Sequence, residues 1–96
     1  MTHRELLRQK HAEIVQIAAR YGAFNVRVFG SVARAQADEQ SDIDFLVEME
    51  PGRSLFDLGG MQSELETALG RPVDVVTEKG LKARIRARVL QEAIPV

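Results

Sequence analysis

Two aspartates two residues apart, preceded by a Gly-Ser pair, are the residues of this chain best suited to chemistry. Residues 29–34 read Phe-Gly-Ser-Val-Ala-Arg, and ten residues separate Ser31 from Asp42 in the run Ser-Asp-Ile-Asp-Phe. Alternate side chains of a strand share a face, so Asp42 and Asp44 are predicted to lie side by side. Two carboxylates about 4 Å apart repel by roughly 4 kcal/mol at an effective dielectric of about 20. A cation relieves that repulsion, and carboxylates completed by water and phosphate oxygens describe a Mg²⁺ site.

The Gly-Ser pair is the predicted phosphate cradle. Gly30 has no Cβ, which lets backbone N–H groups approach an anion closely, and Ser31 adds a hydroxyl donor. A short helix over residues 32–37, with Ser31 as its N-cap, would add a positive partial charge. Arg34 lies about one turn further on and is expected to pair with a phosphate. A lone Gly-Ser pair is more often a plain turn between elements, but the neighbouring aspartates favour phosphate binding.

A third acid, Asp74, repeats the pattern of Asp44. Each interrupts an apolar run expected to form a buried strand, and burying an unpaired carboxylate is costly. Two such acids in two strands predict convergence on one site. The alternative for Asp74 is an ion pair with Arg71 or Arg27.

The elements that must position these residues follow from apolar spacing and capping signals. Strands are expected at 24–29, 42–49 and 72–76, and helices from Thr2 to Tyr21, from Ser54 to Gly70 and from about Leu81 to Pro95. The first two strands are joined too closely for a parallel crossover and should be antiparallel. The predicted fold class is α+β, an α/β sandwich in which a small mixed sheet carries helices mainly on one face. Residues 1–96 are expected to form a single domain.

Composition narrows the function classes. The chain has no cysteine, no apolar run of membrane-spanning length and no secretory signal, so a cytoplasmic protein without membrane contact is expected. Net charge is −1, yet residues 79–88 hold five bases and no acid, which indicates either a basic face or an ordinary solvated helix. A pI near 6.1 and five aromatic residues disfavour direct nucleic-acid binding. His3 and His11 lie on the first expected helix without a nearby cluster of acids and are expected at the surface.

The Gly-Ser pair and the Asp-x-Asp pair together resemble the signature of the DNA-polymerase-β-like nucleotidyltransferases. The short chain is similar to the minimal nucleotidyltransferase group, the MNT or MntA-like antitoxins. Residues 72–77 resemble the family strand that supplies a third carboxylate, and the Arg-rich helix ending in Leu-Gln-Glu-Ala resembles the last family helix. The resemblance implies a nucleotidyltransferase fold like the polymerase-β palm.

The resemblance also implies a site and a reaction. Asp42 and Asp44 would hold two Mg²⁺ ions, Asp74 would join them, and Gly30 and Ser31 would bind the triphosphate of ATP. The reaction would be transfer of AMP to a hydroxyl with release of pyrophosphate, a displacement that two metal ions clamp at both reacting oxygens.

The antitoxin members of this family typically silence a partner HEPN-domain toxin by AMPylating one of its tyrosines, so the resemblance implies that this chain is the antitoxin of a type VII toxin–antitoxin system with such a toxin as its acceptor. Two alternatives stay open from the sequence. The protein could be a non-catalytic antitoxin that masks its toxin, or a nucleotidyltransferase whose acceptor is a small molecule or a nucleic acid.

Overall fold

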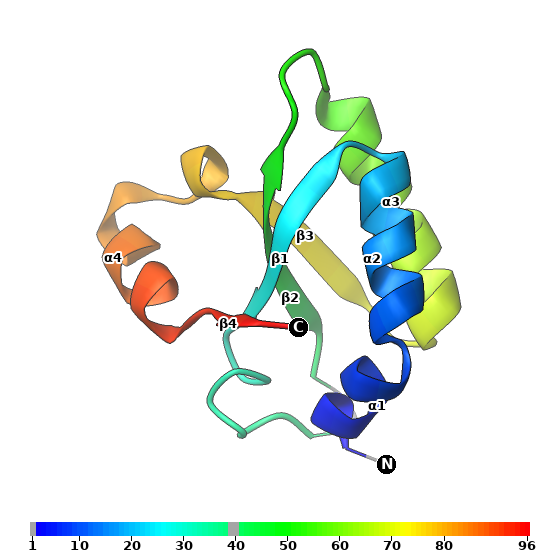
Figure 1. The fold of residues 1–96 in the computed structure, drawn as a ribbon. Helices are drawn as coiled ribbons and strands as arrows, with labels where there is room; N and C mark the ends of the chain where they lie inside the picture. Colours follow the sequence, from blue (N-terminus) through cyan, green and yellow to red (C-terminus); the bar gives the residue numbers. More distant parts are fainter. Residues whose placement is uncertain (1, 39–40) are drawn as a thin grey trace.

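A computed structural model describes residues 2–38 and 41–96 as a four-stranded sheet with helices on both faces (Figure 1). The strands are β1 Ala23–Phe29, β2 Ile43–Met49, β3 Val73–Thr77 and β4 Ile94–Pro95, in the order β3-β2-β1-β4. The helices are α1 His3–Gln9, α2 His11–Arg20, α3 Leu55–Leu69 and α4 Ala83–Glu92, with a 3₁₀ turn, η1, at Glu78–Gly80. No helix in the described part of the chain is both long and apolar enough to cross a bilayer.

The sheet is mixed, which confirms the expected fold class. β1 and β2 are antiparallel, as their short connection predicted, whereas β2 and β3 are parallel and joined through α3. β4 was not predicted, and it adds a two-residue antiparallel pairing to the free edge of β1.

The two faces of the sheet are covered unequally. The larger cluster of buried side chains packs α2 and α3 against one face, and the alternation of β2 sends Ile43, Phe45 and Val47 into it. The smaller cluster lies under α4 on the other face and contains Leu46, Leu81 and Val89. In Figure 1, α4 stands on the opposite side of the sheet from α2 and α3.

Helix α3 follows its sequence signals closely. Ser54 and Asp57 form a reciprocal capping box at its start, and Gly70 ends it in the left-handed conformation. Gly59 and Gly60 inside it would each weaken a helix by about 1 kcal/mol, yet α3 continues through both without interruption. Gly60 has a packing reason, because a Cβ at that position would lie 2.5 Å from Cε1 of Tyr21 at the end of α2.

Two expected helices differ from the structure. The first helix is divided at Lys10, where φ is −98° and ψ is 9°, so that α1 and α2 are separate elements. The predicted short helix over residues 32–37 is wrong, because residues 30–35 form consecutive turns. Ala35 takes a positive φ of 57°, which a right-handed helix does not allow.

Candidate functional site

Asp44 and Asp74 lie directly opposite each other on the parallel strands β2 and β3. Neighbouring strands are about 4.8 Å apart, and the pleat turns both side chains to the α4 face. Asp42 lies just before β2 begins, so the three predicted carboxylates come from one end of this strand pair.

Their exposure differs from the expectation. Asp44 is half-buried, whereas Asp42 and Asp74 are exposed. The prediction that Asp74 would be buried is therefore wrong, because only one face of β3 is covered at that level. Within the described residues no ion pair joins Asp74 to Arg71 or Arg27, so the structural alternative for this acid has no contact to support it.

The environment of Asp44 disfavours its negative charge. Burial is the largest cause, followed by the nearby carboxylates of Asp74 and Asp42, and together they raise the pKa of Asp44 to about 6. The Arg34 guanidinium lowers that pKa, and the Glu92 carboxylate raises it slightly further. A carboxyl held among like charges is a group whose ionised form a cation would stabilise.

Gly30 lies against Asp44. Its φ is +72°, and a Cβ built on it would stand 2.5 Å from Oδ2 of Asp44. Phe29, the last residue of β1, pairs with Asp44 across the sheet, which fixes this approach. A side chain at position 30 would therefore collide with the carboxylate and strain the backbone at the same time. The Gly-Ser turn and the central acid form one local arrangement, as the motif predicted.

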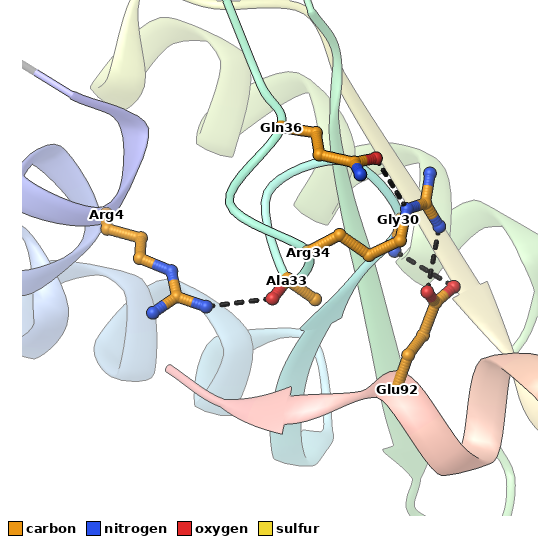
Figure 2. Close-up of polar contacts among 6 residues, drawn as sticks. All are labelled: Arg4, Gly30, Ala33, Arg34, Gln36 and Glu92. Carbon is orange, nitrogen blue, oxygen red and sulfur yellow. Dashed lines mark hydrogen bonds and ion pairs between the residues drawn. The ribbon is translucent and has the colours of Figure 1, made fainter.

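The turn after Gly30 is closed by its own backbone and braced by α1. The amide of Arg34 donates to the carbonyl of Gly30 (3.1 Å), and the amide of Gln36 donates to that of Ser31 (2.8 Å). Figure 2 shows the Arg4 guanidinium reaching this turn, where Nη2 donates to the carbonyl of Ala33 at 2.8 Å. Its Nε also donates to the Val32 carbonyl at 3.4 Å.

His3, beside Arg4, is buried instead of exposed as expected, because it shares the inner face of α1 with Leu7. Its Nε2 has no hydrogen-bond partner among the described residues. Neither contact of Arg4 nor the burial of His3 left a signal in the sequence.

The predicted phosphate ligand Arg34 is already engaged. Its Nη1 lies 2.8 Å from Oε2 of Glu92, at the end of α4, and its Nε donates to Oε1 of Gln36 at 3.1 Å. The amide of Gly30 donates to the other oxygen of Glu92 at 3.4 Å (Figure 2). Glu92 was missed as a site residue. The available signal was its isolation, since it is the single acid among residues 79–96.

The donor set fits a divalent cation that takes part of its shell from a ligand. Among the described residues, no group of three or more acidic, His or Cys side chains stands in position to hold a metal ion by itself. The paired carboxylates of Asp44 and Asp74 nevertheless supply the hard oxygen atoms that Mg²⁺ prefers. Mg²⁺ is commonly held by one or two carboxylates, with waters and phosphate oxygens completing its shell.

A large open groove lies elsewhere. It encloses about 900 Å³ at the far end of β2 and β3, and Val47, Thr77 and Arg86 are among its lining residues. None of the six predicted site residues is among those that line it. The carboxylates and the Gly-Ser turn instead lie together near the surface, outside this groove. The site is recognised by its contacts and its charge and not by a deep pocket.

Comparison with known proteins agrees with this arrangement. The family model described as "Nucleotidyltransferase domain" matches residues 7–96. A Methanocaldococcus jannaschii protein, provisionally named a protein adenylyltransferase, is 42% identical over 84 residues, covering 88% of this chain and 90% of the relative. The protein adenylyltransferase MntA of Thermococcus cleftensis is 38% identical over 81 residues, covering 84% and 82%.

Solved structures extend the likeness to the fold. A chain provisionally described as a minimal nucleotidyltransferase superposes with a TM-score of 0.85 at 50% identity, covering 96% of this chain and 94% of that one. A chain from a crystal structure of a toxin–antitoxin with AMP-PNP gives a TM-score of 0.74 at 19% identity, over 88% and 69%, and shows the shared fold alone. The chain therefore belongs to the nucleotidyltransferase domain family, as an MntA-like minimal nucleotidyltransferase.

Proposed function

We propose that this protein transfers AMP from ATP to a hydroxyl group of a partner protein, in a Mg²⁺-dependent reaction that makes it the antitoxin of a toxin–antitoxin pair. The observation that carries the proposal is the meeting of Asp44, Asp74 and Gly30 at one point of the sheet. Two relatives that share 42% and 38% of their aligned residues with this chain carry names with the same activity, the first provisionally.

The roles of the residues follow from their chemistry. Asp42 and Asp44 would hold the cations, and Asp74 would join them and help to activate the acceptor hydroxyl. Gly30 and Ser31 bind the triphosphate through backbone and hydroxyl donors, and Arg34 pairs with it. When bound, two Mg²⁺ ions neutralise charge on the attacking and leaving oxygens.

The reaction is a displacement at the α-phosphorus of ATP. A bond forms between the acceptor oxygen and this phosphorus while the bond to the oxygen bridging the β-phosphorus breaks, and pyrophosphate leaves with the bonding electrons. The proton of the acceptor hydroxyl passes to the Asp74 carboxylate or to water. Positioning and charge are the main contributions of the protein to such a step.

The proposed acceptor is a tyrosine of a HEPN-domain toxin. Two features support a macromolecular acceptor: Asp42 and Asp74 are exposed at the surface, and the nearby α4 carries exposed basic side chains at Arg84 and Arg88. Charged rows of this kind steer an acidic partner surface during association.

Mass spectrometry of the partner tests the proposal. After incubation with ATP, Mg²⁺ and this protein, the toxin should gain about 329 Da per adenylyl group, located on a tyrosine. Asp44→Asn should abolish the gain while leaving the complex intact. If the toxin were silenced without a mass change, and equally by Asp44→Asn, the protein would act by masking instead. A mass gain on a nucleic acid or a small molecule, with none on the toxin, would overturn the protein acceptor.

A further inference from the structure

The Glu92 carboxylate rests on two of the groups that were assigned to phosphate binding. One oxygen accepts from Nη1 of Arg34 at 2.8 Å, and the other accepts from the amide of Gly30 at 3.4 Å. Figure 2 shows the side chain reaching from the end of α4 across to the turn after β1. We propose that Glu92 is an internal anion that occupies the phosphate cradle of the resting protein, so that the triphosphate must displace it to bind. The inference rests on the function proposed above.

The contacts are those that an anion makes in such a cradle. A guanidinium and a backbone N–H are donors, and a carboxylate satisfies both as a phosphate would. Gly30 has a single N–H, which cannot serve the carboxylate and a phosphate oxygen in full at the same time. Competition at this donor is therefore built into the site.

Burial and backbone anchoring both hold the Glu92 carboxylate in this position. Its side chain is 15% exposed, compared with 43% for that of Arg34, so the ion pair is partly shielded from water. Directly after Glu92 the chain forms β4, where Ile94 pairs with Val28, and the amide of Val96 donates to the carbonyl of Val26 at 3.3 Å. With Val89 buried on the preceding turn, both sides of Glu92 are anchored.

When Glu92 occupies the cradle, ATP cannot bind there. The apparent affinity for ATP is therefore the affinity of the free cradle multiplied by the fraction of molecules in which the cradle is free. A contact that withdraws the end of α4 would raise that fraction. Because α4 also carries the exposed Arg84 and Arg88, partner docking on this helix would couple directly to nucleotide binding.

Calorimetric titration with a non-hydrolysable ATP analogue and Mg²⁺ tests the inference on two variants. Glu92→Gln removes the charge, and Glu92→Asp keeps the charge but shortens the side chain by about 1.5 Å, beyond reach of Arg34. Both should bind the analogue about fivefold more tightly than the wild type. Glu13→Gln, which removes an equivalent charge from the Lys10 ion pair on α2, should stay within about twofold. Adenosine, which has no phosphate, should bind all four proteins equally.

The outcomes separate the inference from the proposed function. Tighter binding by Glu92→Gln alone would show that repulsion at a distance is at work, and would overturn the occupied cradle. Unchanged or weaker binding by both variants would show that Glu92 positions Arg34 for the phosphate, which also overturns it. If the wild type and both variants fail to bind the analogue at all, the proposed function fails and takes this inference with it.

Discussion

The two faces of the sheet differ in function, and successive side chains of β2 point to one face and then to the other. On the α2/α3 face, Phe45 is fully buried within a cluster of fifteen buried side chains. On the α4 face, Asp44 and Asp74 lie beside a cluster of three. A small domain must bury most of its available apolar surface to be stable, and this one buries the larger part of it on the α2/α3 face. The other side is free to hold like charges together, which a continuous core would not tolerate.

The largest effect should come from breaking the stabilising face. Phe45→Ala should lower the free energy of unfolding by about 3–5 kcal/mol, because it removes a fully buried ring and leaves a cavity. Phe56→Ala is the matched control, since Phe56 is 92% exposed and its loss should change stability by less than about 0.5 kcal/mol. Urea denaturation measures both. Equal losses would mean that burial on this face is not what stabilises the domain.

The contact between α2 and α3 can be tested with neighbouring glycines. Gly59→Ala should stabilise the protein by about 0.5–1 kcal/mol, because its Cβ would meet open space and alanine favours the helix. Gly60→Ala should lose that gain, because its Cβ would meet the Tyr21 ring at 2.5 Å. Thermal unfolding of the pair gives the comparison, and an equal gain from both would place Tyr21 elsewhere.

The brace from α1 links the stable part of the molecule to the site. Arg4→Ala removes the hydrogen bonds to Val32 and Ala33, and should cost about 1 kcal/mol of stability. It should also weaken binding of the ATP analogue, because the turn would lose its support. Arg8→Ala, one turn further along α1, is the control and should leave binding unchanged. Similar affinities for the two variants would mean that the turn holds its shape without α1.

Another expected effect concerns pH and the charged face. The pKa of Asp44 in the folded protein is about 6, above its ordinary value of 3.8, so the folded state binds the proton more tightly. Its contribution to stability is therefore complete below pH 4 and is lost as the pH rises through 6. Asparagine does not titrate, so Asp44→Asn should not lose this stability. In EDTA, the free energy of unfolding of the variant should therefore rise relative to that of the wild type as the pH increases from 4 to 7.5.

Asp57 supplies a control of opposite sign. A hydrogen bond from the Ser54 backbone is the main cause that lowers the pKa of Asp57, so its contribution is present at neutral pH and lost as the pH falls. The free energy of unfolding of Asp57→Asn should accordingly fall relative to that of the wild type as the pH rises. Parallel pH profiles for the two variants would contradict the assigned environments.

The parts of the fold that the sequence predicts are those with local signals. Ser54 and Gly70 carry their own capping chemistry, and the short connection after β1 leaves an antiparallel pairing as its simple solution. The division at Lys10 was missed because Leu7 and Ile14, seven residues apart, are in phase with one continuous helix. β4 is too short for any periodic pattern and forms only because β1 offers an open edge.

The features of the site also separate into those with a local sequence signal and those without one. The motif predicts that the Gly-Ser turn lies beside the paired carboxylates, and the strand register, which the sequence does not encode, places Gly30 against Asp44. The exposure of Asp74 depends on how much of the sheet α4 covers, which no local pattern encodes. Glu92 reaches Gly30 across 62 positions of the sequence, so only the folded chain shows that contact.

The most direct test of the account is a thermal shift in the wild type and Asp44→Asn. If the α4 face gathers carboxylates to hold a metal–nucleotide complex, Mg²⁺ with a non-hydrolysable ATP analogue at 100 times Kd should raise the wild-type Tm by roughly 10 °C or more. Asp44→Asn should fold at least as stably at neutral pH without ligand and lose most of that shift. An equal shift in both proteins, or an unfolded Asp44→Asn, would contradict the claim that this carboxylate serves the ligand instead of the fold.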